Sequence, residues 1–105
     1  MSTLSTHVLD TALGKPAAGI RVTLERADGE TVGTGVTDSD GRARDFPPLS
    51  TGEYRLRFAV AEYFATIRRD TFYSDIVIAF RVAHDEHYHV PLLLSPFGYS
   101  TYRGS

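Results

Sequence analysis

Two histidines stand two positions apart near the end of the chain, at His87 and His89. Successive side chains of a β-strand point to opposite faces. A strand through this segment would therefore carry both imidazoles outward and Val90, Leu92 and Leu94 toward a core. Imidazoles titrate near neutral pH and can act as general base or general acid. The pair indicates proton-transfer chemistry on the outer face of a C-terminal strand.

Further reactive groups lie at distant points of the chain. His7 stands in an alternating N-terminal segment, and Arg42 follows an Asp-Gly turn signal. The chain ends with Tyr102, Arg103 and the hydroxyl and carboxylate of Ser105. A guanidinium presents a planar fork of donors to a carbonyl-rich or anionic ring and offsets negative charge that develops there. Imidazoles, a guanidinium and a phenol together suit the hydrolysis of a cyclic amide without a covalent intermediate: one histidine draws a proton from water, arginine holds the carbonyls and tyrosine orients the ring.

Other kinds of site are less well supported. The chain has no cysteine, which excludes thiolate nucleophiles and Cys-ligated zinc. No serine stands in a nucleophile-elbow context, and the acidic residues cluster in turns instead of forming a glycosidase pair. A zinc site of His7, His87 and His89 is conceivable, but two ligands on one strand need a third from a neighbouring strand or chain. The residues alone therefore give a zinc site little support.

The segment Asp38-Ser39-Asp40-Gly41-Arg42 resembles the start of a calcium loop. The later ligands of such a loop and its closing Glu are missing. The sequence instead predicts a turn in which Asp side chains accept backbone hydrogen bonds and Gly41 takes a positive φ. Such a turn would aim Arg42 from a rigid place.

The elements that must position these groups are mostly strands. Short apolar–polar alternations are separated by turn signals every eight to twelve residues, which is typical of an all-β sandwich and not of a βαβ fold. Asp28-Gly29 predicts a tight hairpin turn, and residues 95–98 predict a second turn. The expected strands cover residues 3–10, 20–25, 31–37, 54–60, 75–82, 87–94 and 99–102, with one short helix over 61–69.

Composition narrows the class of protein further. The 105 residues suit one domain, 1–105, with a modest core. The formal net charge is −2 with no basic run, which argues against nucleic acid as a partner. No secretory signal and no apolar run long enough for a membrane span are visible. Together with the lack of cysteine, this favours a cytoplasmic protein that does not bind membranes.

Three blocks of the sequence resemble one known family. The C-terminal HYHVPLLLSP, YST and YRGS, the N-terminal LSTHVLD and the central TDSDGR are similar to the signature of the transthyretin-related 5-hydroxyisourate hydrolases, in the same order. The similarity covers essentially the whole chain. A lone HVLD or DGR would be a weak match, whereas a complete YRGS with both upstream blocks is a specific one.

The resemblance implies a prealbumin-like sandwich of two four-stranded sheets with one short helix. It implies a homotetramer, a dimer of dimers, around a central channel lined by the outer face described above. It also implies hydrolysis of 5-hydroxyisourate, the product of urate oxidation, to 2-oxo-4-hydroxy-4-carboxy-5-ureidoimidazoline. By the same resemblance we expect neither a metal nor an organic cofactor. By the same resemblance the catalytic positions are His7, Arg42, His89 and Ser105, while His7, Arg42, His87, Tyr102 and Arg103 would contact the substrate.

The sequence is also compatible with two other functions, and Pro91 conflicts with the expected strand. The second hypothesis is a non-catalytic small-molecule carrier, because the hormone-carrying transthyretins share the fold. They lack these histidines, this arginine and the YRGS end, all of which this chain has, so the enzyme is the first hypothesis. A sandwich that serves only as an interaction module, with solvated surface histidines, is the third. The conflict concerns Pro91, which cannot donate to a ladder although the family fold places its strand inside a sheet. We expect a local break in pairing at Pro91.

Overall fold

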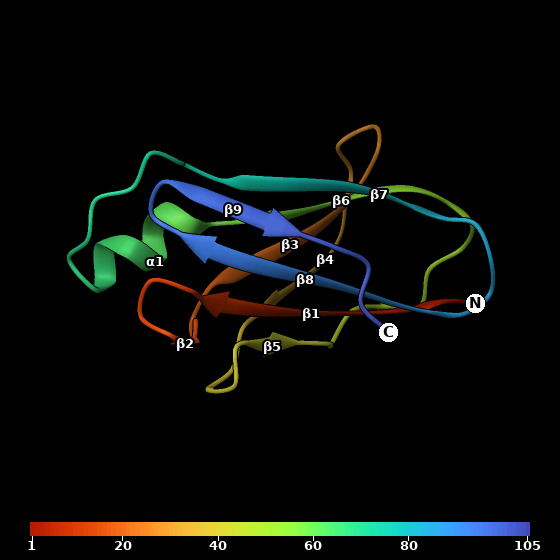
Figure 1. Cartoon of the computed structure of the whole chain (residues 1–105). Helices are drawn as coiled ribbons and strands as arrows, with labels where there is room; N and C mark the ends of the chain where they lie inside the picture. The colour runs from red at the N-terminus through yellow and green to blue at the C-terminus, as the bar shows by residue number, and fades with distance from the viewer.

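Two β-sheets face each other in the computed structural model, which describes residues 1–105 (Figure 1). One sheet has the strand order β2-β1-β8-β9, with β5 also pairing with β1, and the other has the order β4-β3-β6-β7. The elements are β1 (Thr3–Asp10), β2 (Lys15–Pro16), β3 (Arg21–Arg26), β4 (Thr31–Val36), β5 (Arg42–Ala43), β6 (Gly52–Phe58), α1 (Val60–Thr66), β7 (Ile76–Val82), β8 (His87–Ser95) and β9 (Gly98–Thr101). The sandwich with one short helix that the sequence predicts is confirmed. The sheet built on β1 has five strands where four were expected, because β5 pairs with β1 beside the main strand order.

The differences from the expected elements are small and have local causes. Residues 15–16 form β2 and residues 42–43 form β5, two short strands outside the expected set, because both segments pair with β1. The strand expected over 54–60 ends at Phe58, and α1 ends at Thr66 instead of continuing to residue 69. Arg68 then adopts a left-handed φ of 56°, which ends the helix. No helix in the structure has the length and apolar character that crossing a membrane requires.

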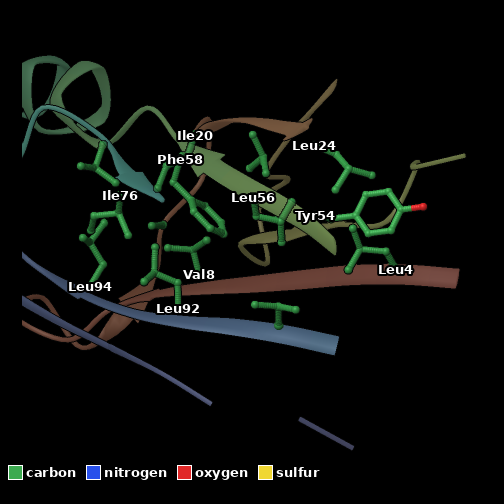
Figure 2. Close-up of a cluster of buried hydrophobic side chains, with 14 of the residues drawn as sticks. Leu4, Val8, Ile20, Leu24, Tyr54, Leu56, Phe58, Ile76, Leu92 and Leu94 are labelled. Atoms are coloured by element: carbon green, nitrogen blue, oxygen red, sulfur yellow. The ribbon is translucent and has the colours of Figure 1, made fainter. Parts of the chain in front are cut away.

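The core lies between the sheets, and alternation along the strands supplies most of its residues (Figure 2). In β8 the pattern is broken at Pro91, which is also buried. Val8 of β1 and Leu92 of β8 are fully buried, and they face the fully buried Leu56 and Phe58 of β6 in the opposite sheet. Burying each such side chain stabilises the fold by about 1.5–3 kcal/mol. Because each inward residue sends its neighbours outward, this packing holds the histidines of β1 and β8 on the outer face.

The strand β8 lies inside its sheet, between β1 and β9, despite Pro91. Pairing with β9 stops at Leu92↔Thr101, and an isolated bridge resumes the same register at His89↔Gly104. The backbone carbonyl of His89 accepts a hydrogen bond from the N–H of Gly104 and therefore faces the C-terminal tail. Backbone groups two residues apart in a strand face the same neighbour, so the N–H that Pro91 lacks would also have faced the tail. The hydroxyl of Thr101 donates to the Pro91 carbonyl at 2.7 Å. The expected break at Pro91 is confirmed, and it is confined to the tail side because β1 pairs with β8 without interruption.

Candidate active site

Strand register brings three of the sequence-predicted residues together on the outer face of the β1 sheet. His7 of β1 lies opposite Arg42 of β5 on one side and opposite Pro91 of β8 on the other. In the parallel β1–β8 pair, Ser5, two residues before His7, lies opposite His89. Thr3, two residues before Ser5, lies opposite His87. Residues paired in a sheet share a face, so His7, Arg42 and His89 lie on one surface although they are far apart in the chain.

The turn before β5 aims Arg42 as the sequence predicts. The Asp38 carboxylate accepts hydrogen bonds from the backbone N–H of Asp40 at 2.9 Å and of Arg42 at 3.0 Å. These bonds favour the charged carboxylate, with the Arg42 N–H first among them, and lower the pKa of Asp38. Gly41 has φ of 77°, and its carbonyl accepts from the Val8 N–H at 2.7 Å. This hydrogen bond links the turn to β1 at Val8, the residue after His7.

A cleft of about 330 Å³ opens on this face. Its lining residues include Arg42, Arg44, His87 and His89, together with residues 3–6 of β1 and Ala43 of β5. His89 is half-buried, and its pKa is lowered first by burial and then by the positive charges of His7, His87 and Arg42. A lowered pKa keeps an imidazole neutral at pH 7, which is the state that a general base requires.

A chain of hydrogen bonds connects the two histidines of β8 to hydroxyls of β1. Ser5 Oγ lies 2.8 Å from His87 Nε2 and 2.7 Å from His89 Nδ1. Thr3 Oγ1 lies 2.6 Å from His87 Nδ1. No side-chain or backbone group of the chain bonds Nε2 of His89, which leaves that nitrogen available to a substrate or water. Ser5 and Thr3 are not among the site residues predicted from the sequence, although their alternation with His7 already places them on the outer face.

The C-terminal tail supports His89 but sends its own polar side chains elsewhere. Arg103 pairs with Glu86 at 2.7 Å and stacks over the Tyr88 ring, with its Cζ 4.7 Å from the ring centroid. The hydrogen bond and charge of Arg103 lower the pKa of Glu86. Tyr102, 57% exposed, lines a second cleft of about 340 Å³ between the tail and β7, and His89 borders that cleft as well.

Within one chain, then, Arg42, His87 and His89 line the first cleft. His7 lies opposite Arg42 on the same face but does not line the cleft, and the tail residues lie outside it. Ser105 is exposed at the end of the chain, beyond the bridge that Gly104 makes to His89. No three His, Cys, Asp or Glu side chains are grouped so that they could hold a metal ion. The functional groups on this face are imidazoles, guanidinium groups and hydroxyls, which transfer protons and bind carbonyl or anionic oxygens.

Comparison with known proteins gives consistent results. The family model described as HIUase/Transthyretin family matches residues 4–104. The 5-hydroxyisourate hydrolase of Caulobacter vibrioides is 49% identical, with all of both chains covered. A structure of Klebsiella pneumoniae 5-hydroxyisourate hydrolase is 44% identical with a TM-score of 0.93 and all of both chains covered. A sea bream transthyretin in complex with thyroxine is 31% identical with a TM-score of 0.89, covering 97% of this chain and 94% of that one.

Proposed function

The chain belongs to the HIUase/transthyretin family, and we propose that it hydrolyses 5-hydroxyisourate, the reaction for which its relatives from Caulobacter and Klebsiella are named. The product is 2-oxo-4-hydroxy-4-carboxy-5-ureidoimidazoline, so the reaction opens a cyclic amide. One observation carries the proposal. His89 is a half-buried imidazole with a lowered pKa and an unbonded Nε2, and it shares a cleft with the guanidinium of Arg42.

The roles follow from the chemistry of these side chains. Arg42 holds substrate carbonyl oxygens with its fork of donors and offsets the negative charge that develops as water adds. His89, neutral at pH 7, takes a proton from the attacking water. His7 lies directly opposite Arg42 and contacts the same end of the substrate, where it can return a proton to the leaving nitrogen. His87 borders the cleft on its exposed side and contacts the substrate there.

The tail residues complete the site in a homotetramer, arranged as a dimer of dimers around a channel. Tyr102, Arg103 and Ser105 are exposed at one edge of the sheet, where they are available to a neighbouring copy. Both sheets end on unpaired edge strands, β7 and β9, and the exposed Val77 and Tyr99 lie on them. Edges of this kind are ready to pair with another chain. Native mass spectrometry or light scattering measures the assembly directly, and a monomer at micromolar concentration would contradict this part of the proposal.

A coupled assay tests the activity. Urate oxidase generates 5-hydroxyisourate, and the decay of its absorbance is compared with and without this protein. Acceleration over the spontaneous reaction supports the hydrolase. If the protein binds the compound without speeding its decay, the carrier hypothesis is favoured, which has the thyroxine-bound sea bream transthyretin as its structural precedent.

Variants assign the chemistry to the site. His89→Ala and His7→Ala should each lower turnover about 10²–10⁴-fold, the usual contribution of a positioned acid or base. Arg42→Lys should also lose activity, because a point charge does not reproduce the guanidinium fork. His84→Ala is the matched control, since His84 is exposed and its ring has no hydrogen-bond partner. Near-normal turnover in both His89→Ala and His7→Ala would defeat the assignment.

We place the enzyme in the cytoplasm. The absence of cysteine from the chain is consistent with a reducing compartment. Cell fractionation with an antibody to the protein would test the location.

A further inference from the structure

The hydroxyl of Ser5 lies between two imidazoles. Its Oγ is within hydrogen-bond distance of His89 Nδ1 and of His87 Nε2, at 2.7 and 2.8 Å. A serine hydroxyl has one proton to donate and lone pairs that accept. When both imidazoles are neutral, Ser5 therefore accepts from one histidine and donates to the other, and the protonation of His89 is tied to that of His87.

The series of hydrogen bonds continues from His87 to the surface through Thr3, whose hydroxyl lies 2.6 Å from His87 Nδ1. In one polarity, His89 Nδ1–H donates to Ser5, Ser5 donates to His87 Nε2, and His87 Nδ1–H donates to Thr3. Nε2 of His89 then carries a lone pair and is a base. In the opposite polarity every donor becomes an acceptor, and His89 Nε2 carries a proton. The same four groups therefore support both the base form and the acid form of His89.

We propose that Ser5 is a positioning residue for the hydrolysis, which sets the tautomer of His89 and connects it through His87 and Thr3 to solvent as a proton path. The inference rests on the proposed function for its chemistry, and its structural part rests on the hydrogen bonds alone. It assigns Ser5 and Thr3 to the site and gives His87 a role beyond contact with the substrate.

The reaction needs such a path. Water adds its oxygen to the amide carbon, the carbon–nitrogen bond breaks, and one of the two water protons ends on the leaving nitrogen. The product bears a carboxyl group, which is ionised at neutral pH, and a ureido nitrogen, which does not take up a further proton. One proton per turnover must therefore reach solvent.

The path carries that proton without moving heavy atoms. Water gives a proton to His89 Nε2, the Nδ1 proton of His89 passes to Ser5 Oγ, and the Oγ proton of Ser5 passes to His87 Nε2. The positive charge then resides on His87, which returns its Nδ1 proton through Thr3 to water.

Electrostatics favours this direction of transfer. His89 is half-buried, whereas His87 is exposed. The charged and titratable groups around His89 are His7 from β1, His87 from β8, Arg42 from β5 and Arg44 beyond it, with Arg103 and Tyr102 of the tail on the far side. A charge on His89 therefore meets both burial and repulsion, and its transfer to the exposed His87 relieves the cost of burial.

The first experiment removes the Ser5 hydroxyl. Ser5→Ala should lower kcat at least about tenfold with little change in KM, because it alters proton transfer and not substrate binding. Ser5→Thr keeps a hydroxyl and should retain activity. Thr34→Ala is the control, since Thr34 is exposed on β4 of the other sheet and its hydroxyl has no hydrogen-bond partner. Equal kcat in Ser5→Ala and wild type would overturn the proposal.

The second experiment reads the tautomer without turnover. Imidazole ¹⁵N shifts of His89 should differ between wild type and Ser5→Ala, because the proton loses its fixed place on one nitrogen. Identical shifts would overturn the positioning role. This readout also separates the two proposals: a protein that does not accelerate 5-hydroxyisourate decay refutes the proposed function, whereas an active protein with unchanged shifts refutes only the role of Ser5.

The third experiment separates proton transfer from packing. His87→Gln keeps a polar side chain beside Ser5 but does not accept a proton at neutral pH, so kcat should fall and added imidazole buffer should restore part of it. His84→Gln is the matched control and should respond to neither change. An unchanged kcat in His87→Gln, or a lowered kcat that imidazole does not restore, would overturn the proton path through His87.

Discussion

Gly104 packs directly against the imidazole of His89. Its N–H donates to the His89 carbonyl at 2.9 Å, and a Cβ placed on Gly104 would come within 2.5 Å of Cδ2 of the His89 ring. Pro91, whose missing N–H interrupts the pairing of β8 with the tail, forms the other wall of this contact, at 3.2 Å from the same Cβ position. The penultimate residue of the chain therefore holds in place the imidazole to which we assign the general base.

Gly104→Ala should accordingly lower activity without unfolding the protein. The added methyl group must displace either the tail or the His89 ring, and a shift of about 1 Å in a catalytic group can cost about 10²-fold in rate. The tail lies at the end of the chain and contributes little to the core, so the melting temperature should change little. Steady-state kinetics with a thermal melt checks both points, and Gly98→Ala, where the nearest atom would be the Ser95 hydroxyl at an ordinary 3.7 Å, is the control.

The titration of the His89 imidazole should reflect the burial and the positive charges around it. Burial, followed by the charges of His7, His87 and Arg42, lowers its pKa below 6.5, so its titration midpoint, read by NMR, should lie on the acidic side of that value. Arg42→Gln removes one positive charge and should move the midpoint part of the way back, because burial remains. A midpoint at or above 6.5 in the wild-type protein would contradict this account.

The same shift has a consequence for stability. The unfolded chain binds a proton at His89 near pH 6.5, while the folded chain binds it only at lower pH, so the unfolded state carries more protons in that window. The contribution of His89 to the free energy of unfolding should therefore fall as the pH drops below about 6.5. Urea unfolding of wild type and His89→Gln between pH 7 and 5 measures the difference, and parallel curves would refute it.

Gly41→Ala should both destabilise the protein and disturb Arg42. The position has φ of 77°, and an added Cβ would collide with the Val8 carbonyl. Backbone strain of this kind costs about 1–3 kcal/mol, and the collision adds to it. Gly14→Ala is the matched control, because Gly14 has φ of 69° but open space around the Cβ position. The difference between the two variants in urea unfolding isolates the collision, and equal losses would show that it contributes nothing.

Asp10→Ala should be among the most destabilising single changes. The Asp10 carboxylate is fully buried and accepts from Leu13 N–H at 3.0 Å, Tyr63 O–H at 2.8 Å and Arg69 Nη1 at 2.9 Å. Removing one partner of a buried ion pair typically costs about 3–5 kcal/mol, and Arg69 is partly exposed, so we expect about 3 kcal/mol. Tyr63→Phe removes one neutral donor and should cost about 1 kcal/mol. A loss in Asp10→Ala no larger than that in Tyr63→Phe would contradict the assignment of the ion pair.

The same buried carboxylate acts on the tyrosine. Burial, and next the hydrogen bond to Asp10, raises the pKa of Tyr63 to about 12. Tyr63 therefore remains protonated, and a donor, throughout the pH range of these experiments.

Local sequence decided which way each reactive side chain faces. The alternation in β1 and β8 sends Val8 and Leu92 into the core, and His7, His87 and His89 must then point outward because the strand period is two. The Asp38–Arg42 turn is equally local, since the Asp38 carboxylate bonds backbone groups two and four residues away. The break at Pro91 follows from the missing N–H of proline alone.

Only the tertiary structure decided which of these side chains meet. Alternation gives the face of a strand but not its neighbour, and the parallel register that sets Ser5 opposite His89 joins residues more than eighty positions apart. The tail shows the same limit: Arg103 turns to Glu86 and the Tyr88 ring, away from the histidines, because an ion pair and a cation–π contact are available there. Pairing of distant strands depends on the packing of the whole sandwich, which no local pattern of residues contains.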